Sequence, residues 1–192
     1  MLRRPKKLKD WTAVIAAAIS ILIYAQQQGL LSDAGQKLQT AQPGFYRITR
    51  FVDGDTLEID MNGKTEKVRF IGVDTPETHK PNTPVQCYGP AASAFTKNTI
   101  GTQSIRLEAD ALSSNRDRYN RLLRYVYLPD GTLMNQKLIE EGYGFYYPYF
   151  PFTKSTQFSF SQQNAKQSNK GLWKNCSPTQ TDKGGYVSNP AV

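Results

Sequence analysis

Histidine, cysteine and long hydrophobic runs are all scarce in this chain of 192 residues. It has one histidine, His79, and two cysteines, so no cluster of histidine and cysteine favours a zinc site, and a catalytic pair of histidines is excluded. The uncharged stretch Trp11–Ala25 would reach only about 22 Å as a helix, short of a hydrocarbon core of about 30 Å. Carboxylates and arginines are therefore the main groups available for chemistry.

Carboxylates and an arginine are concentrated in two neighbouring motifs. The motifs are Val-Asp-Gly-Asp-Thr at residues 52–56 and Arg-Phe-Ile-Gly-Val-Asp-Thr-Pro-Glu at residues 69–77. Asp55 and Asp74 offer the oxygen ligands that Ca²⁺ and Mg²⁺ prefer. Arg69 offers a planar fork of donors suited to phosphate oxygens, and Glu77 is a further carboxylate that can handle water. The combination predicts a nuclease site that holds a hard cation against a phosphodiester and attacks it with water.

Each motif alone has a simpler interpretation. Asp-Gly-Asp-Thr is typical of a tight turn, and Asp-Thr-Pro-Glu is typical of the start of a helix. Here both motifs occur with Arg69 at the end of the intervening strand, and a second arginine-bearing segment, residues 117–122, follows downstream. The conjunction favours the catalytic interpretation.

With these residues in view, the chain resembles the staphylococcal nuclease (thermonuclease) family. The resemblance runs roughly from Phe45 to Cys176 and includes Tyr-Gly-Pro-Ala-Ala-Ser-Ala-Phe-Thr-Lys at residues 88–97. It implies that Ca²⁺ is bound by Asp55, Asp74 and the main-chain carbonyl of Thr75, and that Glu77 is the general base. It implies that two arginines, Arg69 and Arg121, stabilise the phosphate in the transition state. It also implies that the substrate is contacted by Arg118 and Tyr119.

Two segments depart from the family's pattern. Asn120 stands where the family usually has glycine before the second arginine, and asparagine readily adopts the left-handed conformation, so the turn should be kept. The aromatic run at residues 143–150 can be aligned in more than one register, and its tyrosines receive no individual roles.

The pattern of hydrophobic residues, together with the resemblance, predicts an α+β fold that is mainly a β barrel, an OB-fold of five strands with three helices. The predicted strands are 45–51, 56–60, 64–73, 104–110 and 122–128, with a turn at 61–63. The predicted helices are 90–100, 133–141 and about 154–170, each with a glycine just after it.

The amino-terminal part reads as a targeting segment. Residues 1–10 carry five basic side chains and one acidic side chain, and an uncharged stretch follows. Residues 1–25 are either a cleaved signal peptide or, if the helix runs on to Leu31, a membrane anchor. Either interpretation predicts a nuclease domain, residues 45–176, that is secreted or anchored outside the cytoplasm. Residues 26–44 are expected to be a linker, and residues 177–192 a disordered tail.

The two cysteines, Cys87 and Cys176, are predicted to form a disulfide, because an even number of cysteines in an exported chain is most simply explained by a bond. Two unrelated thiols are the alternative. The expected effect of reduction falls on stability more than on activity, since both cysteines lie away in sequence from the predicted site.

The predicted function is a monomeric Ca²⁺-dependent nuclease that acts on DNA and RNA with little sequence preference and leaves 3′-phosphates. A catalytically inactive OB-fold module that binds single strands is the alternative, and a membrane-tethered adaptor protein is a third. The net charge of +8 favours a polyanionic partner, although about half of the excess lies in residues 1–10.

Overall fold

A computed structural model describes residues 7–27, 41–78 and 84–191 of the chain. The chain divides into two compact units, residues 1–39 and 40–192, and each is considered by itself.

The first unit contains helix α1 (Lys7–Gln27). Among the residues that the structure describes, no helix combines the length and the apolar composition needed to cross a membrane. The cleaved signal peptide and the anchor both remain predictions. Most of the predicted linker, residues 28–40, lies outside the described residues, while its last four residues belong to a strand.

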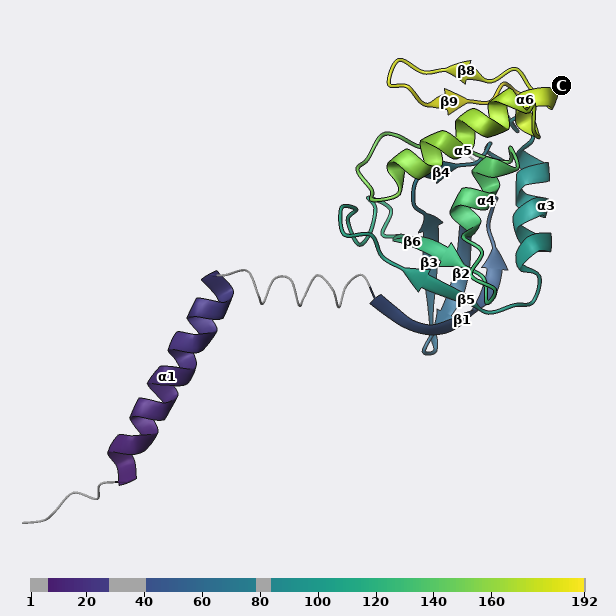
Figure 1. Cartoon of the computed structure of the whole chain (residues 1–192). Coiled ribbons are helices and arrows are strands. Elements are labelled where there is room, and N and C mark those ends of the chain that lie inside the picture. Colours follow the sequence, from purple (N-terminus) through teal and green to yellow (C-terminus); the bar gives the residue numbers. More distant parts are fainter. Residues whose placement is uncertain (1–6, 28–40, 79–83, 192) are drawn as a thin grey trace, which may run out of the picture. The chain divides into compact units, whose positions relative to one another are not determined.

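Five strands of the second unit close into a barrel (Figure 1). They are β1 (Ala41–Phe51), β2 (Thr56–Met61), β3 (Lys64–Phe70), β5 (Ile105–Glu108) and β6 (Leu122–Tyr127). Their order around the barrel is β1-β2-β3-β6-β5, and only β3 and β6 run parallel. The barrel confirms the predicted fold class.

Alternation of apolar and polar residues explains why the hairpin of β2 and β3 forms. Leu57 and Ile59 on β2, and Val68 and Phe70 on β3, are buried in the barrel, while the residues between them face outward. The predicted turn is present, with Asn62 and Gly63 both at positive φ as a two-residue hairpin turn requires. The third predicted strand is interrupted after Phe70, and a short strand β4 (Val73–Asp74) follows it.

Three helices confirm those expected from the sequence. They are α3 (Gly89–Ile100), α4 (Met134–Glu140) and α5 (Ser155–Gln167). Helices α4 and α5 pack against each other, and Leu138 and Phe158 extend the core of the barrel between them. A fourth helix, α6 (Leu172–Asn175), and a short strand β7 (Phe145–Tyr146), which pairs with β4, were not predicted.

The prediction of a disordered tail is wrong for residues 177–191. Strands β8 (Thr179–Gln180) and β9 (Tyr186–Val187) form a hairpin, drawn in yellow in Figure 1. The ring of Tyr186 stacks on Phe145 at 6.0 Å between ring centres and meets the edge of Trp173 at 5.0 Å. These contacts with the rest of the domain order a segment whose composition is typical of disorder.

Candidate active site

Asp55, Arg69 and Asp74 come together on the outer face of the barrel. Arg69 lies between two buried residues of β3, so its side chain points away from the core. Its guanidinium contacts Asp55 Oδ2 at 3.1 Å and Asp74 Oδ1 at 2.6 Å. The side chains of Arg69 and Asp55 are only 12% and 6% exposed, so their ion pair is largely shielded from water, whereas Asp74 is 40% exposed.

Main-chain oxygens fix the orientation of the same guanidinium. Arg69 Nη1 donates to the carbonyl of Phe70 at 3.1 Å and to that of Val73 at 2.6 Å. Four oxygen acceptors thus surround the planar Arg69 guanidinium, and only arginine offers enough donors in one plane to bond to all of them.

The Asp-Gly-Asp-Thr motif is both a turn and a positioning device. Asp55 Oδ2 accepts hydrogen bonds from the main-chain N–H of Thr75 at 2.7 Å and from its hydroxyl at 3.1 Å. The carbonyl of Gly54 accepts a 2.6 Å bond from Thr96 of α3. A Cβ at Gly54 would lie 2.8 Å from the Thr75 side chain, so glycine lets the two motifs approach closely.

Negative charge exceeds positive charge around this turn. Asp53 Oδ1 accepts a 3.2 Å bond from the main-chain N–H of Asp55, and burial together with the charge of Asp55 raises the pKa of Asp53 to about 7. Carboxylates of Asp53, Asp55 and Asp74 are thus near a single guanidinium. A divalent cation would neutralise the excess, and all-oxygen donors fit a hard ion.

The ligand set is nevertheless small. Within residues 7–27, 41–78 and 84–191, no group of three or more histidine, cysteine, aspartate or glutamate side chains is arranged to hold a metal ion. A cation held by Asp55 and Asp74 would therefore need main-chain carbonyl and water oxygens to complete its shell.

Arg121 is held in place by its own turn. Asp117 Oδ2 accepts a 2.7 Å bond from Arg121 Nε, and Asp117 Oδ1 accepts bonds from the main-chain N–H groups of Tyr119 and Arg121 at 2.9 and 3.0 Å. Asn120 has φ +63°, which confirms the predicted left-handed conformation.

Strand register places Arg121 on the same face of the barrel as Arg69. Val68 of β3 pairs with Leu122 of the parallel strand β6, and both side chains are buried. Arg121 precedes Leu122 and therefore shares the outer face with Arg69 on the neighbouring strand.

The predicted substrate contacts lie at the surface beside Arg121. The Arg118 guanidinium sits 4.8 Å from the centre of the Tyr119 ring and donates a 2.8 Å bond to its hydroxyl. Tyr119 is 64% exposed. A flat ring bordered by two guanidinium groups can stack on a base while the guanidiniums contact phosphate.

Glu77 is not on a barrel strand, and its position depends on a residue that sequence reasoning missed. Its main-chain N–H donates to Gln86 Oε1 at 2.8 Å, and its carbonyl accepts a 2.9 Å bond from the N–H of Gln86. Nothing in the sequence marks Gln86, because it reaches Glu77 through a reversal of the chain.

Tyr147 belongs to the aromatic run whose tyrosines received no individual roles from the sequence. Burial and the charge of Asp74 raise the pKa of the Tyr147 hydroxyl, and nearby Arg69 acts in the opposite direction, so the hydroxyl lies in the field of the site. The pairing of Asp74 with Phe145 is what brings this part of the aromatic run beside the carboxylates. Sequence alone could not choose that register.

Comparison with known proteins agrees with this geometry. Residues 67–175 match the family described as Staphylococcal nuclease homologue. The chain is 39% identical to a thermonuclease of Staphylococcus hyicus in an alignment of 175 residues that covers 88% of this chain and 99% of that protein. It is 46% identical to a thermonuclease of Staphylococcus intermedius (71% of this chain, 79% of the relative) and 41% identical to endonuclease YncB of Bacillus subtilis (73% and 64%). The chain therefore belongs to the staphylococcal nuclease family.

Proposed function

We propose that this chain is a Ca²⁺-dependent nuclease, a hydrolase that cuts DNA and RNA with little sequence preference and leaves 3′-phosphates. Family membership and relatives named thermonuclease and endonuclease support phosphodiester hydrolysis. The observation that carries the proposal is the convergence of Asp55, Arg69 and Asp74 on one face of the barrel.

The choice of Ca²⁺ rests on the donor set. Asp55, Asp74 and the carbonyl of Thr75 would hold the ion, and a few protein oxygens completed by water suit the flexible shell of Ca²⁺ better than the strict octahedron of Mg²⁺. When bound, Ca²⁺ would supply positive charge next to the phosphodiester.

The protein side chains divide the remaining work. Arg69 and Arg121 bind the phosphate oxygens and stabilise charge that develops in the transition state. Glu77 accepts a proton from the attacking water as its oxygen bonds to phosphorus. The bond from phosphorus to the 5′-oxygen breaks, which leaves a 3′-phosphate on one fragment and, once the leaving oxygen takes up a proton, a 5′-hydroxyl on the other.

The test is incubation of the protein with single-stranded DNA, duplex DNA and RNA in Ca²⁺, in Mg²⁺ and in a chelator, followed by analysis of the end groups. We expect cleavage in Ca²⁺, weak cleavage in Mg²⁺, none in chelator, and 3′-phosphate ends. Full activity in chelator would contradict the proposal. Binding of single strands without cleavage in any metal would instead support the inactive module.

We also propose that the enzyme works outside the cytoplasm as a monomer, secreted or held at the membrane by residues 1–25. The basic, then uncharged, amino-terminal sequence and the bonded pair Cys87–Cys176 support this location. Cell fractionation tests it, and finding the domain in the cytoplasm with both thiols reduced would contradict it.

A further inference from the structure

Gln86 clamps the main chain of Glu77 from both sides. Its side-chain oxygen accepts a bond from the N–H of Glu77, and its own N–H donates to the carbonyl of the same residue, at 2.8 and 2.9 Å. Gly89 adds a limit, because a Cβ there would lie 2.9 Å from the Glu77 carbonyl oxygen. Two hydrogen bonds and a close contact thus determine the direction in which the Glu77 side chain leaves the main chain.

The segment that carries Gln86 is braced by residues 188–191, which lie beyond the part of the chain matched by the family. Pro190 forms an isolated antiparallel bridge with Gln86. The supporting bonds join Cys87 N–H to the Asn189 carbonyl (2.8 Å), the Ser188 hydroxyl to the Cys87 carbonyl (2.9 Å) and Ala191 N–H to the Val85 carbonyl (2.8 Å).

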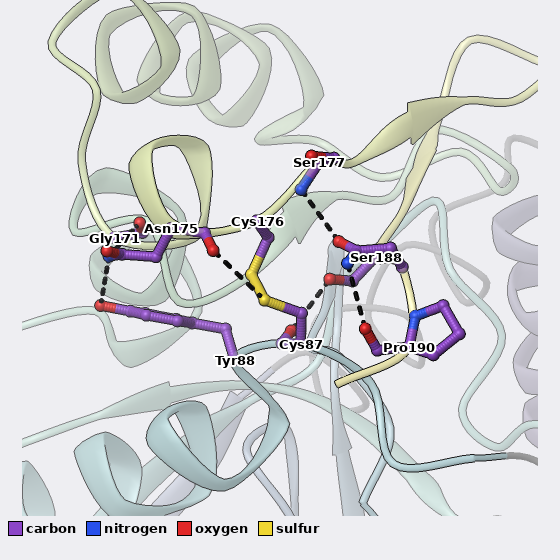
Figure 2. The surroundings of a disulfide bond; sticks show 9 residues. Cys87, Tyr88, Gly171, Asn175, Cys176, Ser177, Ser188 and Pro190 are labelled. Carbon is purple, nitrogen blue, oxygen red and sulfur yellow. Dashed lines mark hydrogen bonds between the residues drawn. A yellow bond between two sulfur atoms is a disulfide. The ribbon is translucent and has the colours of Figure 1, made fainter. Parts of the chain in front are cut away.

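The disulfide lies beside residues 188–191, as Figure 2 shows, and connects two segments that both bond to them. Cys87, the residue after Gln86, is bonded to Cys176, and the next residue, Ser177, donates its main-chain N–H to Asn189 Oδ1 at 2.9 Å. The disulfide thus lies nearer to the predicted site than the sequence suggested, because Cys87 is adjacent to Gln86, which is bonded to the main chain of Glu77.

We propose that Gln86 is a positioning residue for Glu77, and that the brace, residues 188–191 with the Cys87–Cys176 disulfide, keeps Gln86 in place for turnover. The inference rests on the proposed function, in which Glu77 is the base. Arg69 is held on barrel strand β3, Asp55 by its bonds to Thr75 and Asp74 on strand β4, whereas Glu77 depends on this separate support. Loosening the support should lower kcat and leave KM and Ca²⁺ binding almost unchanged.

The decisive experiment compares Gln86→Met in the wild-type chain and in the Glu77→Gln chain, with kcat and KM measured on one oligonucleotide. Methionine keeps the length of the side chain and removes its strong acceptor. We expect kcat to fall about 10-fold or more in the wild-type chain, because small displacements of a catalytic group are costly, and to change little in the Glu77→Gln chain, where the base is already absent. Gln157→Met, which removes a side-chain bond between α4 and α5, is the matched control and should keep wild-type kcat.

Ser188→Ala provides the second variant in case Gln86→Met does not fold. It removes one hydrogen bond of the brace, and we expect a smaller fall in kcat that again disappears in the Glu77→Gln chain. Equal losses in both backgrounds, or a change in KM alone, would overturn the inference. If the wild-type chain cleaves but Gln86→Met lowers kcat equally with and without Glu77→Gln, this inference fails and the proposed function stands. If the wild-type chain does not cleave in Ca²⁺, the proposed function itself fails.

Discussion

At the residue scale, the two arginines of the site differ in burial and in the groups that hold them. Arg69 is almost buried and also holds two main-chain oxygens, so its replacement would disturb the fold as well as the chemistry. Arg121 is anchored mainly through Nε to Asp117, which leaves its terminal nitrogens available to a phosphate. Arg121 is therefore the cleaner residue for testing charge stabilisation.

Arg121→Lys should lower kcat by about 10²-fold or more with little change in KM, because an ammonium cannot reproduce the two-pronged contact of a guanidinium. Steady-state kinetics in saturating Ca²⁺ measure the effect. Arg106→Lys, at a partly exposed ion pair on β5, serves as the control and should keep wild-type kinetics. An unchanged kcat in Arg121→Lys would remove it from the catalytic set.

The two proposed metal ligands should respond differently to loss of charge. Asp74 is 40% exposed, so Asp74→Asn should weaken Ca²⁺ binding and shift the melting temperature little. Asp55 is 6% exposed and accepts two bonds from Thr75, so Asp55→Asn should lose both Ca²⁺ binding and stability. Calorimetric titration with Ca²⁺ and thermal unfolding without it separate the two effects. Wild-type Ca²⁺ affinity in Asp74→Asn would argue against its role as a ligand.

At the scale of elements, an ion-pair clip joins β3 to the turn that carries Arg121. Glu66 is bound by Lys64 at 2.6 Å and by Arg116 at 2.8 Å, and Arg116 also donates to the carbonyl of Asn120. Hydrogen bonds from Arg116 and then from Lys64 lower the pKa of Glu66 to about 2. The clip therefore stabilises the arginine turn from the barrel side.

Acid should break the ion pairs of Glu66 over a defined range of pH. Because the folded pKa of Glu66 lies below its unfolded value of 4.5, the charged form contributes stability fully above about pH 4.5 and loses it as the pH falls towards about 2. Glu66→Gln should lower the free energy of unfolding at pH 7 by about 1 to 2 kcal/mol, since water around the exposed lysine screens the pair. Urea unfolding of both proteins from pH 7 to 2.5 tests this: the gap should narrow with acid, and a gap independent of pH would contradict it.

The elements that sequence could predict are those with a repeating pattern. Strands β2 and β3 alternate in polarity around an Asn-Gly turn, and helices α3, α4 and α5 are each followed at a short distance by a glycine. Strands β4, β7, β8 and β9 have two residues each, too few for any period to appear. They form because distant segments meet, as when Tyr186 packs against both Phe145 and Trp173.

The same distinction applies to the site. Asp55, Arg69 and Asp74 were predictable because they lie on two motifs joined by a single hairpin. Gln86 and Tyr147 were not, because each approaches the site through pairing that depends on the finished fold.

For the whole molecule, the disulfide closes a long loop. It joins residues 89 positions apart, and the chain-entropy model gives a loop of that size a large effect on the unfolded state. Replacing both cysteines, Cys87→Ser with Cys176→Ser, should lower the free energy of unfolding by about 2 to 5 kcal/mol. Thermal unfolding measures the loss. Dithiothreitol should produce the same shift in the wild-type protein and none in the double variant; equal melting temperatures for all samples would contradict the prediction.

The brace at residues 188–191 also bears on the timing of activity during protein synthesis. Ser188 and Cys87 share a hydrogen bond although they lie 101 positions apart, and every barrel strand is translated before Ser188. Domains generally fold as units, and this one draws the support for Glu77 from residues that are translated last. Under the proposed function, a newly made polypeptide would therefore reach full turnover only once residues 188–191 are in place and the Cys87–Cys176 disulfide has formed.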